Sequence, residues 1–150
     1  MTAVPPWPRL LGLAGLLPQL ACAIIAWMGP AQWHEPSRVI GALYAALILT
    51  FLGGTWWGIA AAAPAAERRG GLAWLWIAAV IPSLFAWAIL SLSYLGELAA
   101  EAVLVMVGAG ILVALGVDWR IGPLAPRWWM QLRAPLSLLL GIATIALGLA

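Results

Sequence analysis

The chain has 150 residues, of which 65% are hydrophobic and only 8% are charged. A soluble domain carries roughly a quarter charged residues, so this composition excludes a water-facing surface and predicts an integral membrane protein. The net charge of +2 is too small for a nucleic-acid-binding surface, and a single cysteine (Cys22) and a single histidine (His34) argue against a disulfide, a CxxC metal site or a haem.

Five apolar runs, separated by polar or Gly- and Pro-rich segments, predict one multi-pass domain over residues 1–150. The fold class is an all-α bundle of about five transmembrane helices. The predicted spans are residues 10–28, 38–63, 72–95, 99–117 and 134–150.

The first apolar run contains a proline near its middle. Pro18 leaves the carbonyl of Ala14 without its helical donor, and Gln19 follows directly. The run has features of a signal peptide, but we interpret it as a retained spanning helix. One face of this helix gathers small and polar residues: Gly12, Gly15, Gln19, Cys22 and Ala26.

The remaining segments are predicted as follows. Residues 29–37 form a turn, Pro82 interrupts the third span at its centre, and residues 118–134 form a long loop. The fifth run, near the shortest length that can cross a membrane, presents one face of small and hydroxyl residues. These residues are Ser137, Gly141, Thr144 and Gly148.

The arginines indicate the orientation. Five spans place the termini on opposite sides, with six arginines on the N-terminal side and only Arg38 on the other. Because cytoplasmic loops are enriched in Arg and Lys, the N-terminus is predicted to be cytoplasmic. The six are Arg9, Arg68, Arg69, Arg120, Arg127 and Arg133.

A ridge of small residues at every fourth position runs along the second span. Such a ridge lets another helix backbone come close, either within the bundle or from a partner subunit, and it also leaves room for a flat ligand. We expect it to be a helix-packing or partner interface. The ridge consists of Ala42, Ala46, Thr50, Gly54, Gly58 and Ala62.

Polar residues lie at similar depth in three predicted spans: Gln19, Thr50 and Ser83. In transporters, substrate sites are formed by polar groups that lie at one depth in the membrane beside interrupted helices. These three residues therefore form a possible ligand slot. The alternative interpretation is that each polar group satisfies a carbonyl freed by a nearby proline.

The predicted loop over residues 118–133 combines arginines and tryptophans near one membrane face. Asp118 is expected to form an exposed ion pair with Arg120 or Arg133, contributing at most about 1 kcal/mol. The other residues suit anchoring in lipid headgroups, a headgroup pocket or a partner contact. The lipid-interface residues are Trp119, Arg120, Arg127, Trp128, Trp129 and Arg133.

Three motifs carry a resemblance to a known family. They are FLGGTWWG at residues 51–58, APRWWMQLR at residues 125–133 followed by Leu136 and Ser137, and GLAGLLP at residues 12–18. In this order they resemble the transmembrane protein 69-like family, known as domain of unknown function 3429. The resemblance implies a small multi-pass protein of bacterial or mitochondrial inner membranes, and it implies no activity.

Enzyme signatures such as GxSxG, HExxH or a P-loop are absent from the sequence, and the pair His34-Glu35 is expected to be a solvated loop pair. We therefore expect a non-catalytic protein without a cofactor, acting as an accessory or assembly subunit of a respiratory or photosynthetic membrane complex. The alternative is a binder or passive conduit for a small apolar ligand such as a quinone, lipid or tetrapyrrole.

Expected partners are membrane lipids and other transmembrane subunits or further copies of the chain, with no nucleic acid. The expected location is a bacterial inner membrane rather than a mitochondrial one, because the N-terminus lacks a presequence-like composition.

Overall fold

The computed structural model describes residues 3–67 and 71–150. In this part of the chain all regular structure is helical, and five segments are long and apolar enough to cross a membrane. The predicted all-α membrane bundle is therefore confirmed. The elements are α1 (Pro6–Ala14), α2 (Leu17–Met28), η1 (Ala31–Trp33), α3 (His34–Ala62), η2 (Pro64–Glu67), α4 (Ala73–Tyr94), α5 (Ala100–Ile121), η3 (Gly122–Leu124) and α6 (Trp129–Gly148).

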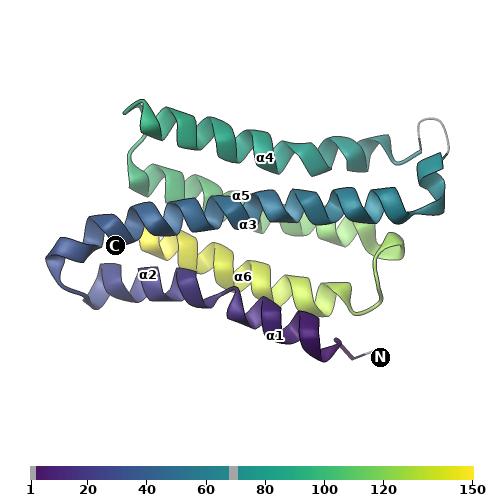
Figure 1. Cartoon of the computed structure of the whole chain (residues 1–150), viewed down its shortest axis with the longest axis horizontal. Coiled ribbons are helices and arrows are strands. Elements are labelled where there is room, and N and C mark those ends of the chain that lie inside the picture. Colours follow the sequence, from purple (N-terminus) through teal and green to yellow (C-terminus); the bar gives the residue numbers. More distant parts are fainter. Residues whose placement is uncertain (1–2, 68–70) are drawn as a thin grey trace.

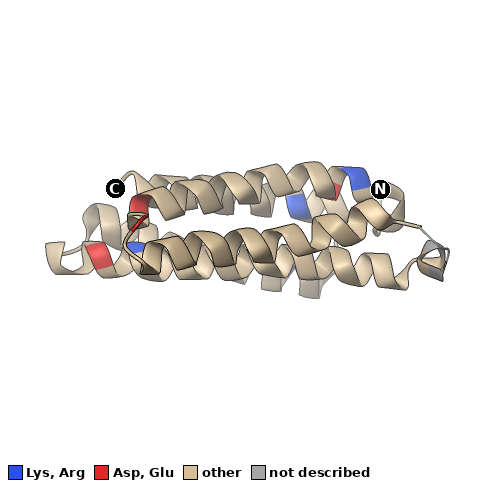
Figure 2. Cartoon of the chain, turned by 90° about the horizontal axis from the view of Figure 1, so that it is seen from above, with Lys and Arg blue, Asp and Glu red and all other residues tan. Residues whose placement is uncertain are grey.

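The helices run along one long axis (Figure 1). Helix α3 lies in the middle of the view, α4 runs along one edge, and α1 and α2 run along the other edge beside α6. The N-terminus lies at the end of the bundle where α6 begins. Charged residues gather toward the two ends and leave a long uncharged middle (Figure 2), as a membrane-spanning bundle requires.

The first span is broken just before its proline. Helix α1 ends at Ala14 and α2 begins at Leu17, because Pro18 has no N–H to continue the ladder. The carbonyl of Gly15 accepts a hydrogen bond from the hydroxyl of Tyr44 on α3. A side chain from a neighbouring helix therefore satisfies one carbonyl at the break, that of Gly15, which follows the predicted carbonyl of Ala14, as happens in membrane bundles.

Several boundaries differ from the predicted ones. Helix α3 begins at His34 rather than residue 38, and α4 continues unbroken through Pro82. Helix α5 extends to Ile121 and α6 begins at Trp129, so the predicted loop over residues 118–134 shrinks to residues 122–128. Charged residues near both loop ends suggested loop, whereas Asp118 and Arg133 are both helical.

Helices α5 and α6 approach each other through glycine. A Cβ atom on Gly108 would lie 2.9 Å from the carbonyl oxygen of Gly141, and one on Gly148 would lie 2.9 Å from that of Glu101. Both distances are too short for a side chain, so the backbones pack directly together. The small-residue face predicted on the fifth run is buried here along its whole length: Ser137, Gly141, Thr144 and Gly148.

Candidate functional site

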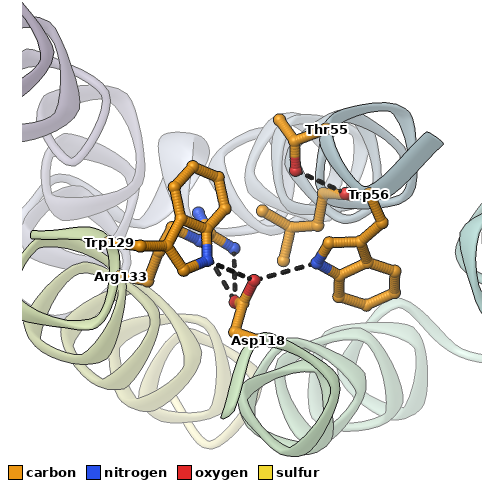
Figure 3. Close-up of polar contacts among 6 residues, drawn as sticks. Thr55, Trp56, Asp118, Trp129 and Arg133 are labelled. Atoms are coloured by element: carbon orange, nitrogen blue, oxygen red, sulfur yellow. Dashed lines mark hydrogen bonds and ion pairs between the residues drawn. The ribbon is translucent and has the colours of Figure 1, made fainter. Parts of the chain in front are cut away.

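The carboxylate of Asp118 joins helices α3, α5 and α6 (Figure 3). It lies near the end of the bundle where α6 begins, which also holds the N-terminus (Figure 1). Its Oδ1 atom accepts hydrogen bonds from the indole nitrogens of Trp56 on α3, at 2.9 Å, and Trp129 on α6, at 3.1 Å. Its Oδ2 atom accepts one from Nε of Arg133 at 3.1 Å and lies 3.0 Å from Nη2 of the same residue. We call these four residues the Asp118 cluster.

The geometry of the helices places each member of the cluster. Trp129 and Arg133 are four residues apart on α6, so their side chains lie on one face, and the guanidinium of Arg133 lies 5.6 Å from the centre of the Trp129 ring. Trp56 lies six residues before the end of α3, about 9 Å inside it at 1.5 Å per residue. Asp118 lies in the last turn of α5. The site thus lies inside the bundle, close to the end at which α3 and α5 finish and α6 begins.

The Asp118–Arg133 pair is buried, which corrects the expected exposed pair. Asp118 is 0% exposed and Arg133 is 8% exposed. Arg120, the other expected partner, lies 5.0 Å from the ring centre of Trp74 instead. A buried ion pair is tolerated only when hydrogen bonds satisfy both groups, and here indole and guanidinium donors occupy both carboxylate oxygens.

A cavity of about 330 Å³ adjoins the cluster and is lined by residues of α1, α3, α5 and α6 and of the segment before α6. We call it the Arg133 cavity. Its walls are mostly apolar, and the lining residues with polar groups on their side chains are Thr55, Trp128, Trp129, Arg133 and Ser137. The apolar walls include Leu11, Leu16, Ile48, Phe51, Leu132 and Leu136. An apolar pocket with a few converging polar groups is the usual form of a small-molecule site.

The predicted slot of Gln19, Thr50 and Ser83 does not form. Gln19 is fully buried, and its amide atoms have no hydrogen-bond partner within the described residues. The Thr50 hydroxyl donates locally to the carbonyl of Leu47 at 2.7 Å, and Ser83 is exposed on the outside of α4. The three residues share a depth in the sequence but face different directions. None of the three lines the Arg133 cavity.

The predicted lipid-interface residues divide into two groups. Trp119, Arg120 and Arg127 are exposed, in positions suited to lipid headgroups. Trp129 and Arg133 turn inward to Asp118, and half-buried Trp128 lines the Arg133 cavity. Arg68 and Arg69, which entered the orientation count, lie outside the described residues.

The small-residue ridge on α3 winds from the inside of the bundle to the outside. Each step of four residues overshoots a helical turn by about 40°, so its five steps rotate roughly 200°. Ala42 and Ala46 are accordingly buried, Thr50 is half-buried, and Gly54, Gly58 and Ala62 are exposed. We call these last three residues the outer glycine face.

The opposite end of the bundle carries a separate charged group. Arg38 lies 3.2 Å from Glu35 and 3.5 Å from Glu101, and a ring nitrogen of His34 lies 2.9 Å from the carbonyl oxygen of Gly29. Because α3 begins at His34, both His34 and Glu35 belong to its first turn rather than to a loop. Within residues 3–67 and 71–150, no three His, Cys, Asp or Glu side chains gather as a metal site would require.

Sequence reasoning missed the convergence of the motifs. Trp56 comes from the motif at residues 51–58, and Trp129 and Arg133 come from the motif at residues 125–133; all three bind Asp118, which lies in neither. The available signal was that Asp118 is the one aspartate of the chain and lies next to an apolar run. A lone carboxylate at a span end requires donors, and the two motifs supply them.

These features define a small multi-pass helical membrane protein. The family model described as "Protein of unknown function (DUF3429)" matches residues 4–149, and the chain belongs to this family. Transmembrane protein 69 of Xenopus tropicalis is 35% identical to it over 134 residues, which cover 88% of this chain and 50% of that protein. The chain thus spans about half the length of this relative. No solved structure matches the chain significantly.

Proposed function

We propose that this protein is a non-catalytic accessory or assembly subunit of a larger membrane complex, respiratory or photosynthetic, acting by helix–helix contact in a bacterial inner membrane. The observation that carries the proposal is the outer glycine face. A Cβ atom added to Gly54 or Gly58 would meet no atom of the described residues within 4 Å. The small ridge therefore continues beyond the contacts that this chain makes with itself.

The outer glycine face suits a transmembrane helix of another subunit. Glycines four residues apart let a second helix backbone come close, and in a membrane such packing stabilises association without a hydrophobic driving force. Toward the end of α3, Gly58 and Ala62 line a groove of about 560 Å³, with Pro123, Leu124 and Pro126 also in its lining. Lipids and other apolar segments would cover the rest of the outer surface, where large apolar side chains such as Leu47, Phe51 and Trp87 are exposed.

The experiment is native mass spectrometry on the tagged protein, expressed at its natural level and extracted gently from its own membrane. The test variant combines Gly54→Leu with Gly58→Leu. The matched control is Gly116→Leu, because Gly116 is also an exposed helical glycine with open space around it. We expect an assembly containing other defined subunits in the wild type and the control, and at least a tenfold loss of that assembly in the double variant.

Two results would overturn the proposal. One is a lone chain in the wild-type preparation, and the other is an assembly that survives the double variant unchanged. An assembly made only of copies of this chain would replace the accessory role with self-association. Retained folding of the double variant, checked by circular dichroism, separates loss of a partner from loss of structure.

A further inference from the structure

We propose that the Arg133 cavity binds a neutral, lipid-soluble molecule whose ring carries a carbonyl oxygen, a quinone by chemical class. The carbonyl accepts hydrogen bonds from the guanidinium of Arg133, and the ring and the start of its tail lie against the apolar walls. This site is distinct from the predicted slot and independent of the outer glycine face.

Arg133 supplies the polar end of the site. Its guanidinium carries five N–H donors in a fixed planar fork. Asp118 takes the Nε donor and lies 3.0 Å from Nη2. Nη2 is buried and carries two N–H groups, and this contact uses at most one of them, while no other acceptor of the described residues meets the nitrogen. A buried N–H without an acceptor is costly, so an acceptor oxygen in the cavity that meets the remaining N–H stabilises the guanidinium.

The charge of the site favours a neutral ligand. Asp118 already compensates Arg133, and its oxygens are occupied by two indole N–H groups and the guanidinium. A second anion would bring uncompensated negative charge into a low-dielectric interior, whereas a carbonyl oxygen accepts hydrogen bonds without adding charge. Carboxylate and phosphate ligands are therefore disfavoured.

The walls favour an aromatic or quinonoid ring on an apolar body. Three aromatic side chains line the cavity, those of Phe51, Trp128 and Trp129, and aromatic side chains favour stacked or edge contacts with another ring. Phe51 and Leu11 are 63% and 64% exposed, so the cavity reaches the outer surface of the bundle. A ligand dissolved in the membrane can enter from there and leave its tail among the lipids.

The test is equilibrium binding of radiolabelled decylubiquinone to the purified protein in nanodiscs of zwitterionic lipid. Leu11→Trp narrows the cavity from its exposed edge, and Leu10→Trp is the matched control, because Leu10 is similarly exposed, at 60%, but does not line the cavity. We expect saturable binding that weakens at least about tenfold in Leu11→Trp and stays within about twofold of wild type in Leu10→Trp. Absence of saturable binding, or equal affinity in the two variants, would overturn the proposal.

A second variant tests the guanidinium. Asp118→Asn combined with Arg133→Gln keeps neutral hydrogen-bonding side chains at both positions and removes the fork. We expect an affinity loss of about tenfold or more, the loss typical of a hydrogen bond to a charged group. If this variant folds and binds decylubiquinone as wild type does, Arg133 does not donate to the ligand carbonyl, and the proposed site is wrong. Leu11→Trp provides the test if the double variant does not fold.

Competition identifies the ligand class. Unlabelled decylbenzene has the same chain and an aromatic ring but no carbonyl, and decanoate is an anion. We expect each to displace the labelled quinone at least about tenfold less effectively than unlabelled decylubiquinone. Equal displacement by decylbenzene would show that the carbonyl is irrelevant, and stronger displacement by decanoate would show that the site prefers an anion. Either result overturns the proposed class.

Discussion

Asp118 enters the apolar bundle with donors on both carboxylate oxygens. Indole N–H groups are neutral, so Trp56 and Trp129 satisfy Oδ1 without adding charge, and Arg133 alone compensates the negative charge at Oδ2. Removing one partner of this buried pair is expected to lower the free energy of unfolding more than removing one partner of an exposed surface pair. A charged group left unpaired in the interior destabilises a protein far more than the pair itself contributes.

We predict that Arg133→Met lowers the free energy of unfolding by about 3 kcal/mol, because it leaves Asp118 buried without a countercharge. Denaturation of the purified protein in mixed micelles, followed by circular dichroism, measures the change. Arg127→Met is the control, since Arg127 is exposed in the neighbouring loop, and it is expected to change stability by less than about 0.5 kcal/mol. Equal effects in the two variants would mean that the buried pair has no special role.

At the scale of elements, two consecutive glycines of α3 lie in different environments, one against a neighbouring helix and one on the outer surface. Gly53 faces α4, where an added Cβ would clash with the carbonyl oxygen of Ala79, whereas Gly54 faces outward into open space. The i to i+4 ridge contains Gly54 but not Gly53, whose neighbours four residues away are Leu49 and Trp57. The pattern therefore marked the glycine that the bundle leaves open and did not mark the one that packs against α4. The direction in which α4 packs decides which glycine is structural.

This difference gives a paired prediction. Gly53→Ala is expected to destabilise the protein by about 2 kcal/mol, because the backbone of α4 must move away. Gly54→Ala is expected to be neutral or to stabilise by up to about 1 kcal/mol, because alanine favours the helix more than glycine does. The same unfolding measurement compares the two. A larger loss at Gly54 than at Gly53 would contradict the packing of α3 against α4.

At the scale of the whole molecule, the described arginines divide unequally between the two ends. Arg9, Arg120, Arg127 and Arg133 lie toward the N-terminal end, and Arg38 lies at the other. By the positive-inside rule we predict that the N-terminal end faces the cytoplasm. The membrane potential and the anionic lipids of the cytoplasmic leaflet would both favour this orientation.

The orientation can be tested with single cysteines, since the native Cys22 is buried and gives little background. Glu97→Cys and Arg127→Cys place thiols at exposed positions on opposite ends. In cells with a permeabilised outer membrane, a membrane-impermeant maleimide is expected to label Glu97→Cys at once and Arg127→Cys only after lysis. The reverse pattern would show that the N-terminus lies outside.

Much of this architecture could be predicted from the sequence, because hydropathy identifies the apolar runs that are long enough to cross a bilayer. The number of spans and the packing face of the fifth run, with Gly141 and Thr144, follow from composition and helical period. The site could be predicted only in part. Arg133 was one of the two expected partners of Asp118, but the burial of the pair and the indole donors could not be predicted, because they depend on how distant helices pack. Sixty-two residues separate Trp56 from Asp118, and no local pattern reports that contact. The predicted slot was wrong for a related reason. Equal depth in three spans does not say which way each side chain faces around its helix, and the three residues were Gln19, Thr50 and Ser83.

The Asp118 cluster also has a consequence for biogenesis. During synthesis α5 emerges before α6, so Asp118 reaches the membrane ahead of Trp129 and Arg133. Until α6 inserts, the carboxylate has only Trp56 among its partners, and the intermediate carries an uncompensated charge at the edge of the lipid. Arrival of α6 then neutralises that charge and completes the wall of the Arg133 cavity in one event. The cluster would thus distinguish a finished chain, whose Asp118 is fully paired, from an unfinished one.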